Sequence, residues 1–372
     1  MKILTITCHK VYNHGASLQQ FALLYFLNNS GFEAKTINYQ PKYLAEIFSY
    51  YGVANPKFKK NLFLKLLYVI AKLPSKINDI KRRNAFNDFE KNFIPSTDKL
   101  FVNNIQLKNN TPKADAYICG SDQIWNSLLQ NGKDPAFYLD FVANNKKKIS
   151  YAASFAIDNV SDEWKDFVKE KVNRIDYISV RENSGLRILE NMGINRAVQV
   201  LDPVFLISKK EWEKLFIKNK EVEPYVLVYD FENDEIIKNY ALYLKEKNGW
   251  KIFALSKKIK YADEVFWSIG PDKFLNLLYH SHFVLANSFH ATAFSVIFGK
   301  QFLIFNRQIK INTRMRDFLQ DFGLQERLVS QMDKKLVTQK IDFNQISHVL
   351  ENKIQYSKNF LLNTLNNERM DK

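Results

Sequence analysis

The chain has 372 residues, of which 46% are hydrophobic, so we expect two domains with a substantial buried core, and the composition argues against wholesale disorder. Its 54 lysines and arginines exceed its 39 acidic residues, and the net charge of +15 favours anionic partners: phosphorylated metabolites, lipid diphosphates, acidic membrane surfaces or nucleic acid. The chain has only two cysteines, Cys8 and Cys119, so it contains no disulfide framework and no CxxC zinc pattern. Each follows an apolar run, and we expect each to be a buried small hydrophobic residue.

The first half of the chain alternates strand-like and helix-like segments. Residues 2–8 form a predicted strand, residues 16–27 carry apolar side chains at helical spacing, and residues 33–39 alternate as a second strand. This β-α-β opening indicates a parallel sheet. The remaining strands of this half are predicted at 114–119, 148–153, 177–180 and 197–201, with a helix at 184–192.

Residues 41–95 interrupt this alternation with a predicted helical insertion. Within it, residues 57–83 are densely basic and contain the single acid Asp79. This stretch either covers the core as an amphipathic helix or makes a peripheral contact with anionic lipid. No recognised nucleic-acid module occurs, so nucleic acid is not an expected partner. Because no apolar run approaches the ~18 residues of a membrane span, we expect a cytoplasmic protein, soluble or peripheral at the inner face of the membrane.

The second half repeats the same alternation after a polar bridge at 202–224. Its strands are predicted at 225–229, 251–255, 282–286 and 301–305, and its helices at 235–247, 271–279 and 290–298. A last helix is predicted at 343–366 and should pack back on the body. Two α/β units joined by one bridge place the natural ligand site in a cleft between them.

A strand-to-helix junction in the second half is the first candidate site. The apolar run ends at Asn287, and a helical pattern begins with Ser288-Phe289-His290. Free N–H groups at a helix start bind anions, and histidine titrates near neutral pH. We therefore predict a phosphate held at Ser288 and Phe289 with His290 as proton carrier. The alternative is a capping serine followed by a structural histidine.

The stretch 120–126, Gly-Ser-Asp-Gln-Ile-Trp-Asn, is the second candidate, because it follows a strand at the edge where α/β proteins bind ligands. Ser121, Asp122 and Gln123 surround the aromatic Trp125, an arrangement that suits the hydroxyls and the C–H face of a sugar. Asp122 is the candidate base or orienting acceptor, and Trp125 would stack on the sugar. The alternative is a turn capped by Asp122.

Two further groups of residues follow strand ends or start helices. Gly15, between Asn13 and Gln19, permits close approach to the backbone after the first strand. Arg181 and Arg314 could bind a carboxylate or phosphate bidentately, and the alternative for both is an ion pair with a nearby acid. The dinucleotide, Walker, GxSxG and HExxH motifs are absent, and we predict no metal and no cofactor.

Taken in order, these stretches resemble the polysaccharide pyruvyl transferase family. The matching motifs are Asn13-x-Gly15 with Leu18-Gln19, residues 120–126, 151–155, Ser179-Val180-Arg181-Glu182 with Ser184-Gly185, Leu201-Asp202-Pro203-Val204, residues 288–294, and Asn312-Thr313-Arg314-Met315 before Gly323-Leu324. The insertion 41–95 lies outside the resemblance. The chain departs from the family at Ala156 and Ala291, where glycine is common in relatives.

The resemblance implies an α/β fold of two Rossmann-like domains facing across a cleft, similar to the GT-B glycosyltransferases. Residues 1–205 would form the N-terminal domain on the acceptor side, and residues 206–345 the C-terminal domain on the phosphoenolpyruvate side. Residues 346–372 would be the helix that packs back. His290 and Arg181 are similar to the family's phosphoenolpyruvate-binding positions.

The implied reaction transfers a pyruvyl group from phosphoenolpyruvate to a pair of sugar hydroxyls and forms a ketal. The acceptor would be a cell-surface or capsular polysaccharide precursor, free or as a lipid-linked oligosaccharide. Binding phosphoenolpyruvate needs concentrated positive charge, which the helix start, Arg181 and Arg314 can supply. The alternatives are a nucleotide-sugar-dependent GT-B glycosyltransferase and a non-catalytic protein that binds sugar or phosphate. The pyruvyl transferase interpretation requires the His290 imidazole to lie at the gap between the two halves, neither sealed in the interior nor pointing away from the gap.

Overall fold

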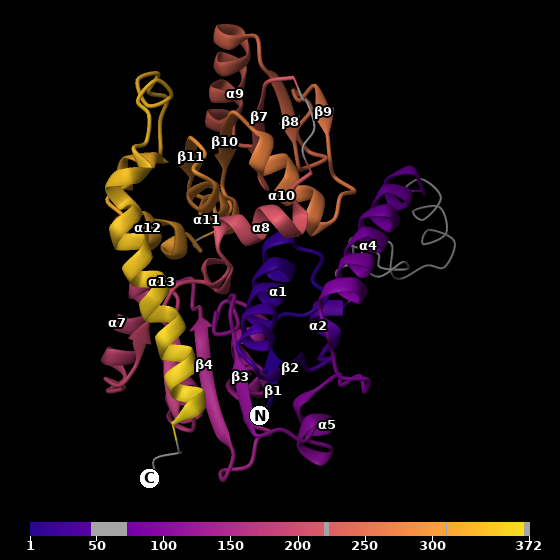
Figure 1. Cartoon of the computed structure of the whole chain (residues 1–372), viewed down its shortest axis with the longest axis vertical. Helices are drawn as coiled ribbons and strands as arrows, with labels where there is room; N and C mark the ends of the chain where they lie inside the picture. Colours follow the sequence, from indigo (N-terminus) through magenta and orange to yellow (C-terminus); the bar gives the residue numbers. More distant parts are fainter. Residues whose placement is uncertain (46–72, 219–222, 310, 368–372) are drawn as a thin grey trace.

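The computed structural model describes residues 1–45, 73–218, 223–309 and 311–367, and it shows two parallel sheets covered by helices (Figure 1). The first sheet has six strands in the order β2-β1-β3-β4-β5-β6. Its strands are β1 (Lys2–Ile6), β2 (Glu33–Thr36), β3 (Ala116–Cys119), β4 (Lys147–Ala153), β5 (Tyr177–Val180) and β6 (Val198–Gln199).

The second sheet also has six strands, in the order β12-β11-β10-β7-β8-β9. Its strands are β7 (Tyr225–Tyr229), β8 (Lys251–Ala254), β9 (Glu264–Val265), β10 (Phe283–Ala286), β11 (Phe302–Phe305) and β12 (Leu328–Val329). Two parallel sheets with helices confirm the predicted α/β class with two Rossmann-like units. The domain boundary at residue 205 stays a prediction.

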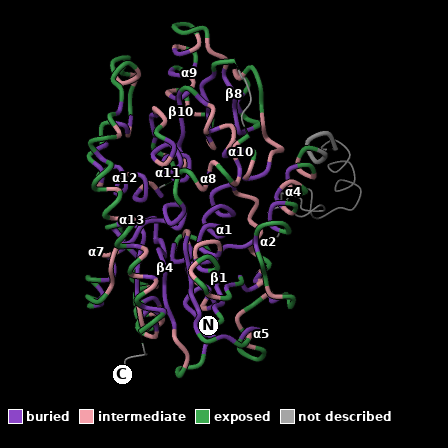
Figure 2. The backbone as a smooth tube through the Cα atoms, viewed as in Figure 1, coloured by how far each residue is buried: buried purple, intermediate pink, exposed green. Residues whose placement is uncertain are grey.

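Continuous apolar runs explain why the central strands form. β7, with the sequence Tyr-Val-Leu-Val-Tyr, and β10, with Phe-Val-Leu-Ala, are buried at every position (Figure 2). Helices cover both faces of a parallel sheet, so its inner strands lack the polar alternation of a half-exposed strand. The parallel direction also brings the carboxyl ends of the strands to one edge of each sheet, which positions the site below.

Helices connect the strands. In the first half these are α1 (His14–Asn29), α2 (Lys42–Ala45), α4 (Leu73–Phe93), α5 (Asn104–Asn109), α6 (Asp162–Asn173), α7 (Asn183–Asn191) and α8 (Lys209–Phe216). In the second half they are α9 (Glu235–Asn248), α10 (Pro271–His280), α11 (Phe289–Phe298), α12 (Thr313–Asp321) and α13 (Phe343–Asn366).

Helix α8 lies inside the stretch that the sequence analysis treated as a polar bridge. Ser208 caps it by accepting a hydrogen bond from the backbone N–H of Glu211. Trp212 and Phe216, one turn apart, are both buried. An amphipathic helix therefore forms where the high content of charged residues suggested a linker, because one face of the segment is strongly apolar.

Helices α13 and α4 are among the described elements that contact both halves. The last helix, α13, runs alongside both sheets (Figure 1), and its Ser357 Oγ accepts a hydrogen bond from the backbone of Leu201 at 2.9 Å. On α4, the buried Arg82 donates to the carbonyls of Trp267 and Tyr12 at 2.7 and 2.9 Å. Arg82 thus joins the insertion to the second half.

Most of the basic stretch 57–83 lies outside the described residues. Its described part belongs to α4, where Asp79 accepts hydrogen bonds from Lys257 Nζ and Trp267 Nε1, both at 2.9 Å. Asp79 and Arg82 therefore contact the second half of the chain. The predicted lipid contact of the remaining residues stays a prediction.

Candidate functional site

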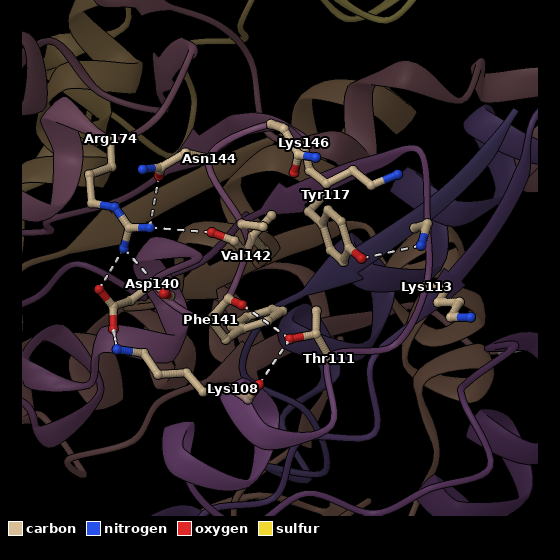
Figure 3. A pocket seen from close by; sticks show the side chains of 13 residues that line it. Lys108, Thr111, Lys113, Tyr117, Asp140, Phe141, Val142, Asn144, Lys146 and Arg174 are labelled. Atoms are coloured by element: carbon tan, nitrogen blue, oxygen red, sulfur yellow. Dashed lines mark hydrogen bonds and ion pairs between the residues drawn. The ribbon is translucent and has the colours of Figure 1, made fainter.

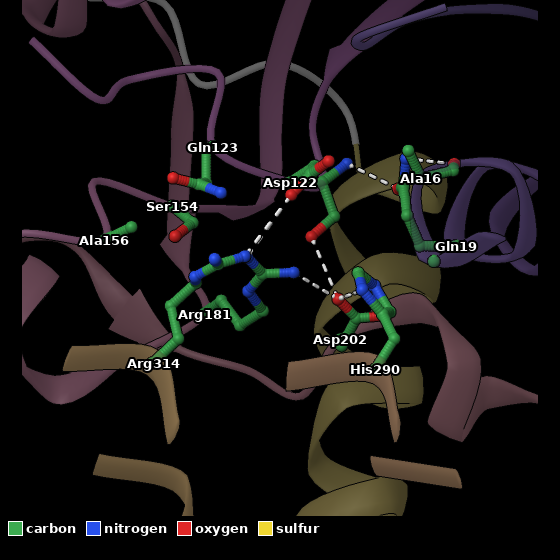
Figure 4. A network of polar contacts seen from close by, with 12 residues as sticks. Ala16, Gln19, Asp122, Gln123, Ser154, Ala156, Arg181, Asp202, His290 and Arg314 are labelled. Carbon is green, nitrogen blue, oxygen red and sulfur yellow. Dashed lines mark hydrogen bonds and ion pairs between the residues drawn. The ribbon is translucent and has the colours of Figure 1, made fainter. Parts of the chain in front are cut away.

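The candidate residues of the first half lie at the carboxyl edge of its sheet, and those of the second half come from the starts of α11 and α12 (Figure 4). Asp122 follows β3 and Arg181 follows β5, whereas His290 and Arg314 stand in the first turns of the two helices. All four meet in one network of polar contacts between the halves. The fold thus brings together side chains that the sequence separates by up to nearly two hundred positions.

Ser288 is the N-cap of α11, so the capping role considered as the alternative for this serine is present in the structure. Its Oγ accepts a 3.5 Å hydrogen bond from the backbone N–H of Ala291, and its carbonyl accepts from Thr292. This cap fixes the direction of the first turn and points His290 towards the first half of the chain. Ala291, one of the departures from the family pattern, is fully buried within this helix.

His290 faces the first half, as expected, but its imidazole is enclosed, with only 5% of the residue exposed, which contradicts the expectation of a ring open to the gap. Its Nε2 lies 3.5 Å from Asp202 Oδ2. Its ring also lies against Gly15 in α1: a Cβ added to Gly15 would stand 2.0 Å from Nδ1. The group that closely approaches Gly15 is thus a side chain from the opposite half, and contact of Gly15 with a substrate stays a prediction.

Asp202 is the centre of the network (Figure 4), and the sequence analysis did not select it as a site residue. Its Oδ2 accepts a 2.5 Å hydrogen bond from Arg181 Nη1 and lies 3.5 Å from both His290 Nε2 and Ser121 Oγ. Burial raises the pKa of Asp202, but His290 and Arg181 oppose burial and hold that pKa well below its ordinary value. The carboxylate is therefore ionised, and it pairs with Arg181 and lies beside the His290 imidazole.

Arg181 is 4% exposed and surrounded by acids. Besides Asp202, its guanidinium lies 3.7 Å from Asp122 Oδ1 and 3.7 Å from Glu182 Oε2. Its Cζ lies 4.5 Å from the centre of the Phe289 ring, so Phe289 supports the guanidinium through a cation–π contact. The prediction of concentrated positive charge here is wrong in one respect: acids balance the arginines.

Arg314 approaches the same acid from α12. Its Nη1 lies 3.6 Å from Asp122 Oδ1, and burial, together with the neighbouring Arg181, lowers the pKa of Arg314 to about 10. Asp122 thus stands between two guanidinium groups at distances longer than hydrogen bonds. Its backbone has φ of 70°, in the left-handed region that favours glycine and asparagine.

Several buried polar atoms of this network make no hydrogen bond with any described residue. They are Arg181 Nε and Nη2, Glu182 Oε2, His290 Nε2, Arg314 Nε, and the hydroxyls of Ser184 and Thr313. Native proteins satisfy nearly all buried polar groups, so such a concentration at one place marks a site for a polar ligand. Because most of these atoms are donors, an anion suits them.

Glu182 is a second acid that sequence reasoning missed. Its Oε1 accepts from Ser154 Oγ at 2.8 Å and from the backbone of Ala156 at 2.9 Å. Burial raises the pKa of Glu182, although Arg181 opposes this effect. Ala156, the other departure from the family pattern, has φ of 57°, in the left-handed region that favours glycine.

The remaining polar candidates hold the loops of the first half. Asn13 caps α1 by accepting from the backbone N–H groups of Gly15 and Ala16. Gln19 accepts from the backbone of Ser121 at 3.2 Å, and Ser121 Oγ donates to the Ala152 carbonyl at 2.7 Å. These contacts position the loop that carries Asp122.

Gln123 and Trp125 complete that loop. The Gln123 side chain accepts from Asn126 Nδ2 at 3.0 Å. Trp125 is fully buried, stacks on Tyr138 with ring centres 5.5 Å apart, and donates its indole N–H to the Phe137 carbonyl. This burial corrects the prediction that Trp125 stacks on a sugar: its ring belongs to the core because both faces and the N–H already have partners.

The described ranges contain no group of three or more His, Cys, Asp or Glu side chains that could hold a metal ion. Among the helices that the structure describes, none is both long and apolar enough to cross a bilayer.

Comparisons with known proteins address the fold and the family. A family model described as polysaccharide pyruvyl transferase matches residues 13–308. No curated protein sequence matches the chain. A putative UDP-N-acetylglucosamine 2-epimerase from Listeria monocytogenes is similar in structure, with a TM-score of 0.52, 10% identity, and coverage of 100% of this chain and 98% of that one. The UDP-N-acetylglucosamine 2-epimerase of Rickettsia bellii is also similar in structure, with a TM-score of 0.51, 12% identity, and coverage of 98% of this chain and 96% of that one. At such identities the likeness concerns the fold alone, and it agrees with the GT-B-like arrangement.

Proposed function

Because the chain belongs to the polysaccharide pyruvyl transferase family, we propose that it transfers a pyruvyl group from phosphoenolpyruvate to two hydroxyls of a sugar and forms a ketal. The acceptor is a precursor of a cell-surface or capsular polysaccharide, free or lipid-linked. The observation that carries this proposal is the set of unpaired buried donors at His290, Arg181 and Arg314. Phosphoenolpyruvate offers a phosphate and a carboxylate, and both are strong acceptors for such donors.

The balance of charge supports a specific mode of binding. Asp122, Glu182 and Asp202 oppose Arg181 and Arg314, so the site cannot take up a further anion without compensation. The long contacts of Asp122 leave guanidinium N–H groups free for an incoming anion. A proton on His290 supplies further compensation, and the resulting imidazolium is the acid that the reaction needs.

In the proposed reaction, His290 donates its proton to C3 of phosphoenolpyruvate, and the resulting positive charge at C2 draws the attack of the first sugar hydroxyl. Asp122 accepts the proton of that hydroxyl. The bond between C2 and the phosphate oxygen then breaks, and Asp122 passes its proton to the departing phosphate. The second hydroxyl attacks C2 and closes the ketal ring, and its proton returns to His290, which restores the acid. Asp202, whose Oδ2 lies 3.5 Å from Nε2, stabilises the protonated imidazole electrostatically and acts as a positioning residue. Since His290 is enclosed, the two halves must separate to admit the substrates.

One incubation tests the proposal. The purified chain is mixed with phosphoenolpyruvate and a panel of galactosides and mannosides, and released phosphate and product mass are measured. His290→Ala should lower turnover roughly 10²–10⁴-fold. Nucleotide release from a sugar nucleotide would favour the glycosyltransferase alternative, and tight binding without product would favour a non-catalytic protein.

A matched pair of variants on α12 tests the binding of phosphoenolpyruvate. Arg314→Gln removes a buried cation of the site, whereas Arg316→Gln removes a cation whose side chain is 41% exposed and paired with Asp158. Arg314→Gln should weaken phosphoenolpyruvate binding by roughly tenfold or more, as expected for losing one charge-assisted hydrogen bond. Equal effects of the two substitutions would contradict a binding role for Arg314.

A further inference from the structure

A basic pocket (Figure 3) is lined by residues that precede the amino ends of strands in the first sheet, whereas the candidate active-site residues follow carboxyl ends. It has a volume of about 720 Å³ and adjoins the amino ends of β3 and β4, because Ala114 and Lys146 line it just before these strands begin. The active-site residues follow the carboxyl ends of the same sheet. The pocket is therefore a separate feature that the proposed reaction does not use.

The charge of this pocket is strongly positive. Asp140 is its single acidic lining residue, and it binds Lys108 at 2.6 Å, Arg174 at 2.6 Å and Lys171 at 3.1 Å. Burial raises the pKa of Asp140, but hydrogen bonds from Lys108 and Lys171 outweigh burial and lower that pKa to about 2. One permanent negative charge is thus shared among three cations.

Two further lysines add to this surplus. Lys113 and Lys146 line the pocket, and neither makes an ion pair with the part of the chain that the structure describes (Figure 3). Two acids lie just outside the lining, and each accepts a hydrogen bond from a backbone N–H group. Asp115 accepts from Lys2, and Asp176 accepts from Lys148. The pocket therefore offers cations to an outside anion.

Exposed aliphatic side chains lie on, or shortly before, the helix that carries Lys108. Ile105 on α5 is 69% exposed, and Leu100, which precedes α5 in the chain, is 48% exposed. Ile105 and Lys108 share a face of α5 because they are three residues apart. Asn104, on the same helix, donates to Asp140 at 3.1 Å and ties α5 to the pocket. Apolar anchors next to clustered cations are the pattern of a protein face that rests on an anionic membrane.

We propose that this face docks on a membrane that contains anionic lipid, with lipid phosphates at Lys108, Lys113 and Lys146 and with Ile105 and Leu100 at the hydrocarbon boundary. The occupant is a lipid surface because a soluble anion would give the two exposed aliphatic side chains no partner. Docking in this way keeps the gap between the halves away from the bilayer surface. It involves no residue of the catalytic network.

Sedimentation with vesicles tests this proposal on the full chain. Phosphatidylcholine vesicles with and without phosphatidylglycerol are compared at low and high salt. We expect binding only to the phosphatidylglycerol vesicles, and loss of that binding at high salt. The pair Lys113→Gln/Lys146→Gln should lower vesicle affinity roughly 30-fold, since each such charge near a surface contributes about a fivefold factor. Ile105→Asn should also weaken binding.

The matched control is Lys247→Gln/Lys260→Gln, which removes two exposed lysines from the second half of the chain. Helix α9, which carries Lys247, lies at the other end of the molecule from α5 (Figure 1). Equal binding by the pocket variants and the wild type would overturn the proposal, as would equal binding to neutral vesicles. Inorganic phosphate that bound the pocket while vesicles did not would also overturn it.

A second readout separates this proposal from the proposed function. The pocket variants should keep wild-type turnover on a soluble acceptor, because the pocket lies at the far edge of the sheet. Vesicle binding is measured without substrates. Failure of pyruvyl transfer would therefore leave the result of the sedimentation experiment unchanged.

Discussion

Gly15 should not tolerate even a methyl group while His290 lies against it. In Gly15→Ala the new Cβ would stand 2.0 Å from Nδ1 and 2.2 Å from Cγ of the imidazole. Since real Cβ atoms essentially never approach other atoms within 3.0 Å, the ring must move by about 1 Å or more. The substitution thus displaces the proposed acid without touching it chemically.

The size of the effect follows from opposing contributions. Alanine favours a helix over glycine by up to about 1 kcal/mol, whereas overpacking costs about 1–3 kcal/mol. The free energy of unfolding should therefore fall by no more than about 2 kcal/mol. A displacement of about 1 Å in a catalytic group costs on the order of 10²-fold in rate. We expect a folded protein with a turnover lowered about 100-fold.

A double-mutant cycle checks this reasoning by urea unfolding and by the pyruvyl transfer assay. In a His290→Ala background the ring is gone, so Gly15→Ala should raise the free energy of unfolding by up to about 1 kcal/mol. Equal effects of Gly15→Ala in both backgrounds would refute the contact between Gly15 and His290. Wild-type turnover in Gly15→Ala alone would refute the role given to that contact.

Three other predictions concern buried groups. Asp202→Asn should lower the free energy of unfolding by about 3 kcal/mol at pH 7, because it removes the buried carboxylate that accepts the hydrogen bond from Arg181. Since folding lowers the pKa of Asp202, this deficit should shrink as the pH falls below about 4, which urea unfolding at pH 7 and below pH 4 measures. Glu90→Gln should raise the free energy of unfolding at pH 8 by at most about 3 kcal/mol and have little effect at pH 4. Burial raises the pKa of Glu90 to about 7, so ionisation of this carboxyl above that pH opposes folding in the wild type. Trp125→Phe should cost about 1–3 kcal/mol in thermal or urea unfolding and leave the KM for the acceptor unchanged; a raised KM would restore a sugar-binding role.

The sequence predicted those elements whose hydrophobic pattern is complete within the segment. β7 and β10 are buried at every position, so their apolar runs are sufficient evidence for strands. Helix α8 was missed because its charged residues dominate the composition, although the spacing of Ser208 and Glu211 is that of a capping box and Trp212 and Phe216 share one face. The capping residues, taken together with the apolar face, are the signals in the sequence that predict this helix.

The candidate site was predictable in its members and less so in their arrangement. The motifs selected Asp122, Arg181 and His290, and the fold brings all three into one network. Asp202, the shared partner of Arg181 and His290, lies in a matching motif, but no local pattern shows that its carboxylate turns towards residues so far away in the sequence. Trp125 shows the converse: a motif does not reveal which of its side chains point into the core.

The network couples substrate binding to protonation. Asp122, Glu182 and Asp202 already exceed Arg181 and the buried Arg314 in formal charge, and a phosphorylated carboxylic acid adds further negative charge to an enclosed site. Binding should therefore take up a proton, which calorimetry in buffers of different ionisation enthalpy measures directly. His290→Gln should abolish the uptake if the imidazole receives the proton, whereas Glu182→Gln should abolish it if the carboxylate whose pKa burial raises is the acceptor. Only the first result is consistent with His290 as the acid that protonates C3, and binding without any proton uptake would contradict the whole electrostatic account.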